Sequence, residues 1–154
     1  MSSLIYAFLQ TRDTLAPVFL RMALVAIFTF HGSQKAFGWF GGDGYFATLR
    51  LMTNGTGLGL PSVLATAAIV GELLVAVLLF FGFLTRMAGF LVVVLMAGAI
   101  WLIHSGTAFS HLEFPLLVLA SGVSLIFSGG GYFSLDRRIS AVLLPPYSGR
   151  LGIR

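Results

Sequence analysis

Four long apolar stretches divide the chain, and short segments rich in glycine and polar residues separate them. The stretches cover residues 15–31, 62–83, 87–103 and 112–129. A helix needs about 20 mainly apolar residues to cross a membrane, with a range of roughly 17–25. Because lipid offers no hydrogen-bond partners, the backbone of each span must pair within a helix. The pattern therefore predicts an all-α fold, an antiparallel bundle of four transmembrane helices.

The connections between these stretches differ in length. The second and third spans are joined by a tight turn, Gly82 to Arg86, so these two helices are expected to be antiparallel neighbours. A long loop over residues 32–61 follows the first span and contains a predicted short helix from Tyr45 to Met52. Three consecutive glycines, 129–131, predict the end of the fourth helix. Residues 134–154 are expected to form a surface tail on the cytoplasmic side.

Composition strengthens the membrane assignment and excludes several kinds of chemistry. Of the 154 residues, 58% are hydrophobic and only 9% are charged, whereas a soluble domain carries about 25% charged residues. We therefore expect one integral-membrane domain over residues 1–154, and a water-soluble enzyme is excluded. The chain has no cysteine, which excludes disulfides, a thiolate nucleophile, iron–sulfur clusters and cysteine-based zinc sites. The basic residues flank the apolar runs and do not cluster, so no nucleic-acid partner is expected.

The basic residues also predict the orientation in the membrane. With four spans, both termini lie on one side, and that side holds most of the positive charge. Its arginines are Arg12, Arg86, Arg137, Arg138, Arg150 and Arg154, with Arg21 close by. The opposite side holds only Lys35 and Arg50. The positive-inside rule therefore places both termini in the cytoplasm and the loop 32–61 outside.

Two ionisable residues, Arg21 and Glu72, lie within the predicted spans. Each lies about 15 Å from the predicted outer end of its helix, marked by His31 and by Ser62. Both charges would then lie at one level near mid-membrane, where a charge is costly and usually finds a partner inside the bundle. The first hypothesis is an Arg21–Glu72 ion pair. Whether such a pair serves function or only holds the helices together stays open at this point.

The outer rim gathers further polar side chains. These are His31, Lys35, His104, His111 and Glu113. Imidazole and carboxylate groups suit a transition metal, but no pair here has the spacing of a known metal-binding motif. Glu113, just before Pro115, is interpreted as a residue of the first turn of the fourth helix. We therefore predict neither a metal nor a haem.

Several short motifs, in this order, resemble the landmarks of a known family. They are Arg21, Phe30-His31-Gly32 with Lys35, Phe37-Gly38, Phe40-Gly41-Gly42, Gly71-Glu72, Gly82-Phe83-Leu84-Thr85-Arg86 and Gly131-Tyr132-Phe133-Ser134-Leu135-Asp136. No single motif is unique, but their order and spacing resemble the DoxX family over about residues 15–138.

The resemblance implies a small four-helix protein of the bacterial or archaeal cytoplasmic membrane. Members of this family are linked to quinone-reducing thiosulfate oxidation, to terminal oxidase complexes, to oxidative-stress complexes and to metal-responsive operons. Arg21, His31, Lys35 and Glu72 match the polar positions of the family, so these four are the predicted cofactor-binding residues. No catalytic residue is assigned.

These expectations lead to a first functional hypothesis and two alternatives. The first is an integral-membrane subunit of a redox or oxidative-stress complex that engages a quinone near the outer face. There, His31 and Lys35 would donate to a carbonyl, and Glu72 would relay a proton. Electrons would come from a soluble or membrane redox partner. The alternatives are a small membrane carrier or metal-handling protein, which would require a homo-oligomer, and a non-catalytic scaffold for soluble enzymes.

Overall fold

The computed structural model describes residues 14–55, 59–103 and 108–143. Four helices in these ranges are long and apolar enough to cross a membrane, and no strand occurs among the residues described. They are α2 (Ala16–Phe37), α4 (Ser62–Phe81), α5 (Thr85–Ile103) and α6 (Phe109–Ser128). The shorter elements are a 3₁₀ turn η1 (Trp39–Gly41), α3 (Gly44–Arg50), a π-helical turn η2 (Leu51–Gly55) and α7 (Leu135–Leu143). The predicted all-α membrane bundle is confirmed.

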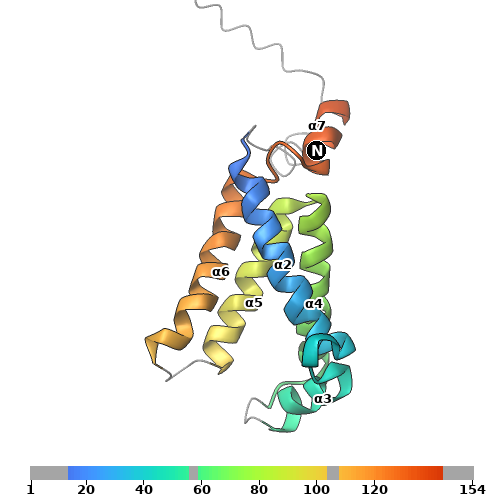
Figure 1. Cartoon of the computed structure of the whole chain (residues 1–154), viewed down its shortest axis with the longest axis vertical. Coiled ribbons are helices and arrows are strands. Elements are labelled where there is room, and N and C mark those ends of the chain that lie inside the picture. The colour runs from blue at the N-terminus through green and yellow to red at the C-terminus, as the bar shows by residue number, and fades with distance from the viewer. Residues whose placement is uncertain (1–13, 56–58, 104–107, 144–154) are drawn as a thin grey trace, which may run out of the picture.

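The four long helices form a bundle with two different ends (Figure 1). Helix α2 packs mainly on α4, α5 packs mainly on α6, and α4 also contacts α5. At one end, the loop end, η1, α3 and η2 lie beside the end of α2 (Figure 1). The opposite end of the bundle is called the α7 end, because it holds α7 together with the start of α2 (Figure 1). The chain before α2 meets the chain after α6 there, since Tyr132 N donates to Thr14 O at 3.2 Å.

Helix α2 is longer than the hydropathy pattern predicts, because it ends at Phe37 and not at residue 31. Gly38 stops it in the left-handed conformation at φ 72°, and the Gly38 N–H donates to Gln34 O, a common helix ending. The added turns contain Gly32 and Ser33, which are both buried. Small residues let two membrane helices approach closely. The segment that interrupts the apolar pattern is therefore a helix contact and not the start of a loop.

The remaining boundaries include one confirmation and two corrections. Helix α6 ends at Ser128, just before the three glycines that predict its end. It begins at Phe109, so Glu113 lies beyond its first turn and Pro115 lies inside the helix. The interpretation of Glu113 as a first-turn residue is therefore wrong. Helix α7 occupies part of what the sequence indicates as a surface tail.

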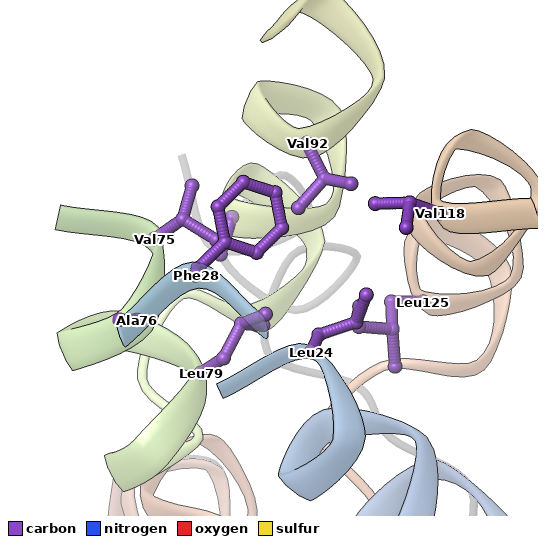
Figure 2. Close-up of a cluster of buried hydrophobic side chains, with 9 residues drawn as sticks. Leu24, Phe28, Val75, Ala76, Leu79, Val92, Val118 and Leu125 are labelled. Atoms are coloured by element: carbon purple, nitrogen blue, oxygen red, sulfur yellow. The ribbon is translucent and has the colours of Figure 1, made fainter. Parts of the chain in front are cut away.

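All four spans contribute to one central apolar cluster. It contains Leu24, Phe28, Val75, Ala76, Leu79, Ala88, Val92, Val118 and Leu125. Figure 2 shows Phe28 between Val75 of α4 and Val92 of α5, whereas Leu24 faces Leu125 of α6. Large apolar side chains also cover the outside of the bundle, including Phe19, which is 73% exposed, and Phe127, which is 71% exposed. Such a surface suits lipid as the surrounding solvent.

Candidate functional site

Arg21 lies at the α7 end and is almost fully buried, with 1% of its surface exposed. Its Nε donates to Leu79 O at 2.8 Å and its Nη2 donates to Phe80 O at 3.0 Å, both in the last turn of α4. Its Nη1 donates to Gly130 O at 2.7 Å and to Phe133 O at 2.9 Å. Carbonyls at a helix C-terminus lack partners within the helix and carry partial negative charge. Arg21 therefore joins α2 to the end of α4 and to the segment after α6.

Asp136 is the second buried charge at this end, with 1% exposure. Its carboxylate accepts hydrogen bonds from Leu84 N at 2.7 Å and from Thr85 N at 2.8 Å, and its own N–H donates to Gly82 O at 3.0 Å. Asp136 thus caps the N-terminus of α5 from α7, where a carboxylate is favoured by the helix dipole. The bonds also hold Leu84 at φ 47°, a conformation that residues other than glycine seldom adopt.

These groups form a closed polar cap, defined here by Arg21, Gly82, Thr85, Gly130 and Asp136. A Cβ added at Gly82 would lie 2.6 Å from the Arg21 guanidinium carbon, and one added at Gly130 would lie 2.7 Å from Thr85 Oγ1. The cap is tightly packed and joins the helices, although Thr85 Oγ1, like one oxygen of Glu72, is buried without a hydrogen-bond partner among the described residues. The sequence shows the motifs that contain these residues, but nothing in the spacing of the motifs indicates that they lie together in the fold.

The predicted Arg21–Glu72 ion pair is therefore wrong. Because α2 continues to Phe37, Arg21 lies about 24 Å along the axis from the true end of the helix. Helix α4 runs antiparallel to α2, which brings Leu79 beside Arg21 and leaves Glu72 nearer the loop end. Arg21 thus lies apart from the other three predicted cofactor-binding residues.

Glu72 pairs instead with Lys35. Glu72 Oε1 forms an ion pair and a hydrogen bond with Lys35 Nζ, joining the last turn of α2 to the middle of α4. The Glu72 side chain is 9% exposed and the Lys35 side chain is 34% exposed. The second carboxylate oxygen, Oε2, is buried and has no hydrogen-bond partner among the residues that the structure describes. Buried polar atoms are nearly always satisfied, so this oxygen marks a place where a further group can bind.

Helices α2 and α4 approach closely at Gly32, and this lets Lys35 contact Glu72. At Gly32, one turn before Lys35, an added Cβ would lie 2.9 Å from Leu73 Cδ2 and 3.4 Å from Glu72 Cβ. The missing side chain lets α2 approach α4 at this level. A glycine one turn from a lysine is the sequence feature that could have indicated this contact. It can be interpreted only once α2 is known to continue past residue 31.

Helix α3 covers this end of the α2–α4 contact. The Tyr45 hydroxyl and Thr66 Oγ1 are 2.8 Å apart, a hydrogen bond that fastens α3 to α4. Gly42 packs against the Gln34 backbone, where no side chain would fit, so the loop folds back onto α2. Sequence reasoning predicts the short helix in this loop, but it does not identify Tyr45 or Thr66 as the residues that hold it.

His31 lies one turn before Lys35 on α2 and is exposed. Its ring meets Phe30 edge-on at 5.5 Å and lies 6.3 Å from the ring of Phe114 in α6. Phe30 in turn stacks on Phe40 of η1 at 5.1 Å. Lys35 and Glu72 therefore meet where the end of α2 packs on the middle of α4, and His31, one turn before Lys35, is turned toward α6.

The other residues of the predicted outer rim do not join this group. His111 and Glu113 are exposed on α6, and His104 lies outside the described residues. In the ranges that the structure describes, no three His, Asp or Glu side chains gather as metal ligands would. The candidate site is therefore the Lys35–Glu72 pair with His31 nearby. The Lys35 ammonium can donate hydrogen bonds, and the Glu72 carboxylate can exchange a proton.

Comparison with known proteins identifies a family. A model of the DoxX family matches residues 16–105, a range that holds Arg21, His31, Lys35 and Glu72. The chain is also 32% identical over 118 residues to the "Putative oxidoreductase CatD" of Bacillus subtilis (strain 168). That alignment covers 76% of this chain and 81% of the relative. No solved structure matches the chain.

Proposed function

Since the chain belongs to the DoxX family, we propose that it is an integral-membrane subunit of a redox or oxidative-stress complex that engages a quinone at the loop end. The name of the Bacillus subtilis relative, an oxidoreductase, supports a redox role. The observation that supports the proposal is the buried Glu72 Oε2, which has no partner in the described part of the chain although Oε1 of the same group is paired with Lys35.

The residues at the loop end supply polar groups of the kind that a quinone headgroup needs. Quinones are apolar rings with two oxygens, and their reduction takes up protons as well as electrons. Lys35, which is partly exposed, would donate to one oxygen while keeping its contact with Glu72. Glu72, a carboxylate in the ion pair, would take up a proton from water at Oε2 and relay it to the second oxygen as the redox partner supplies the electrons. His31, on the same face one turn away, would donate from the side toward α6.

The electrons must come from elsewhere. The chain has no cysteine, so it carries no thiol relay or cysteine-bound cluster that would transfer electrons to the site. We assign the electron supply to a soluble or membrane redox partner. The activity then belongs to the complex, with this chain supplying the quinone site.

The quinone-to-protein ratio of the gently purified protein tests the proposal, measured by solvent extraction and mass spectrometry. We expect a near-stoichiometric quinone in the wild type and a loss of at least tenfold in Glu72→Gln and in Lys35→Gln. Arg50→Gln is the matched control, because Arg50 is an exposed cation of α3 at the same end. A ratio no higher than that of bulk lipid, or an equal loss in Arg50→Gln, would contradict the proposal.

The same unpaired oxygen supports a second candidate function, a small membrane carrier. A buried carboxylate inside a membrane bundle is a frequent feature of proton and cation pathways. Cation uptake into vesicles containing only this protein, lost in Glu72→Gln, would favour the carrier. The redox subunit should give no such uptake.

A further inference from the structure

The turn after α2 folds back along that helix and does not lead away from the bundle. Gly38 ends α2 at φ 72°, and Phe40 of η1 continues the reversal at φ 54°. Gly42 then packs against Gln34, because a Cβ added at Gly42 would lie 2.5 Å from Gln34 Cα. Gln34 Nε2 also donates to Phe40 O at 3.3 Å. The segment that follows α2 therefore lies beside the last turn of the same helix.

The ring of Phe40 reaches further back along α2. It stacks on the ring of Phe30 with 5.1 Å between the ring centres, and Phe30 lies about 10 Å before the end of α2. Phe30 is 43% exposed on a helix long and apolar enough to cross a membrane, so its ring belongs to the surface that lipid covers. Phe40 itself is 64% exposed. The stacked pair therefore joins η1 to the lipid-facing side of α2.

The backbone of Phe40 is strained, and the strain serves this contact. Residues with a Cβ seldom adopt a positive φ, and glycine or asparagine usually occupies such positions. A strained conformation persists only where the surrounding contacts maintain it, and the ring contact that Phe40 makes is the stack on Phe30. The turn is therefore shaped to hold an aromatic ring against the outside of α2.

Further exposed aromatic side chains lie in and beside this turn. Trp39 is 60% exposed and Phe37 is 57% exposed, and their rings lie 5.1 Å apart. Phe46 of α3 is 77% exposed. Phe37, Trp39, Phe40 and Phe46 are named here the loop-end aromatic cluster. Aromatic residues, tryptophan above all, are enriched where a membrane meets water, whereas a cluster of large rings exposed to water alone is unusual.

We propose that the loop-end aromatic cluster anchors the turn in the membrane interface, with the rings of Trp39 and Phe40 among the lipid acyl chains. The partner is lipid and not a protein surface, because the stack on Phe30 makes the cluster continuous with the face of α2 that crosses the membrane. The interface accommodates both the apolar rings and the polar backbone of a turn that is not a regular α-helix. The segment that hydropathy assigns to an outer loop thus begins inside the membrane interface.

Tryptophan fluorescence tests the anchor, because the chain has only two tryptophans, Trp39 and Trp101. Trp101→Phe, a change at a 75% exposed position of α5, leaves Trp39 as the single reporter. In phosphatidylcholine vesicles, we expect lipids brominated on their acyl chains to quench at least half of the Trp39 emission. Iodide in the water should quench Trp39 at least fivefold less than it quenches N-acetyltryptophanamide, a fully exposed indole.

A second change, made in the same Trp101→Phe protein, tests the ring stack itself. Phe40→Asn keeps a residue that tolerates positive φ but removes the ring that stacks on Phe30, so quenching of Trp39 by brominated lipid should fall at least twofold. Phe127→Asn, the same change at a 71% exposed position of α6, should leave the quenching as it was.

Three results would overturn the proposal. Stronger quenching of Trp39 by iodide than by brominated lipid would place the turn in water. Quenching by neither would place it against protein, such as a second copy of this chain. Quenching unchanged in Phe40→Asn, or lowered equally in Phe127→Asn, would show that the stack on Phe30 does not seat the turn in lipid.

Discussion

At the scale of single residues, the two ends of the bundle differ in how completely their buried charges are satisfied. Arg21 donates to four carbonyls and has almost no exposed surface. Glu72 has one oxygen paired with Lys35 and one buried oxygen that finds no partner within residues 14–55, 59–103 and 108–143. A buried charge whose hydrogen bonds are all made stabilises the fold, whereas one with an unpaired atom can bind a further group or exchange a proton.

Arg21→Lys should therefore destabilise the protein without changing its quinone content. A lysine ammonium cannot reach all four carbonyls, and each buried carbonyl left unpaired costs about 1–3 kcal/mol. We expect a clearly lower thermal unfolding temperature in detergent, with the quinone bound per folded protein unchanged. Arg50→Lys on the exposed face of α3 is the control. An unfolding temperature equal to that of the wild type would contradict the role of the polar cap.

At the scale of helices, small residues decide where the spans touch. Helices α5 and α6 meet backbone to backbone, since a Cβ added at Gly122 would lie 2.8 Å from Val92 Cγ1 and 2.9 Å from Gly89 O. Farther along α5, a Cβ added at Gly98 would meet nothing within 4 Å. The contact is therefore local, and the two glycines offer a matched comparison.

Gly122→Ala should be much more damaging than Gly98→Ala. The first change forces α5 and α6 apart, a strain of about 1–3 kcal/mol for an overpacked contact, whereas the second adds a methyl group to open space. Thermal unfolding of the two purified variants measures the difference. The account of the α5–α6 contact fails if both variants unfold at the same temperature.

Helix ends also explain how far the sequence alone was informative. Hydropathy identifies all four spans, and the glycines after α6 mark its end. Hydropathy does not locate the end of α2. Gly32 and Lys35 are residues typical of a loop, and only the structure shows that they contact α4. Placing the end of α2 at residue 31 put Arg21 and Glu72 at the same level, and this led to the wrong partner for Glu72. The polar cap was equally hidden, because Arg21 and Asp136 lie on helices at opposite ends of the chain.

At the scale of the whole molecule, the bundle has the polar cap at its α7 end and the Lys35–Glu72 pair toward its loop end. The polar cap holds α2, α4, α5 and α7 together at one end. At the other, Tyr45 of α3 is hydrogen-bonded to Thr66 of α4, and Lys35 and Glu72 join α2 to α4. The positive-inside rule predicts that the α7 end faces the cytoplasm, which would place the proposed quinone site toward the outer face.

Single cysteines can test this orientation, because the natural chain has none. Asn54 and Val142 are exposed at the loop end and on α7. In intact cells, we expect a membrane-impermeant maleimide to label Asn54→Cys at once and Val142→Cys only after the membrane is opened. The reverse order of labelling would show that the orientation is inverted.

The most direct test of the central claim is to map where a quinone binds. A photoreactive azido-quinone would be cross-linked to the protein in native membranes, and the labelled peptides would be identified by mass spectrometry. The account predicts labels around His31 and Lys35 of α2 and around Glu72 of α4, suppressed by excess unmodified quinone and by Glu72→Gln. Labels confined to the outer surfaces of α5 and α6, or labels that excess quinone does not suppress, would contradict it.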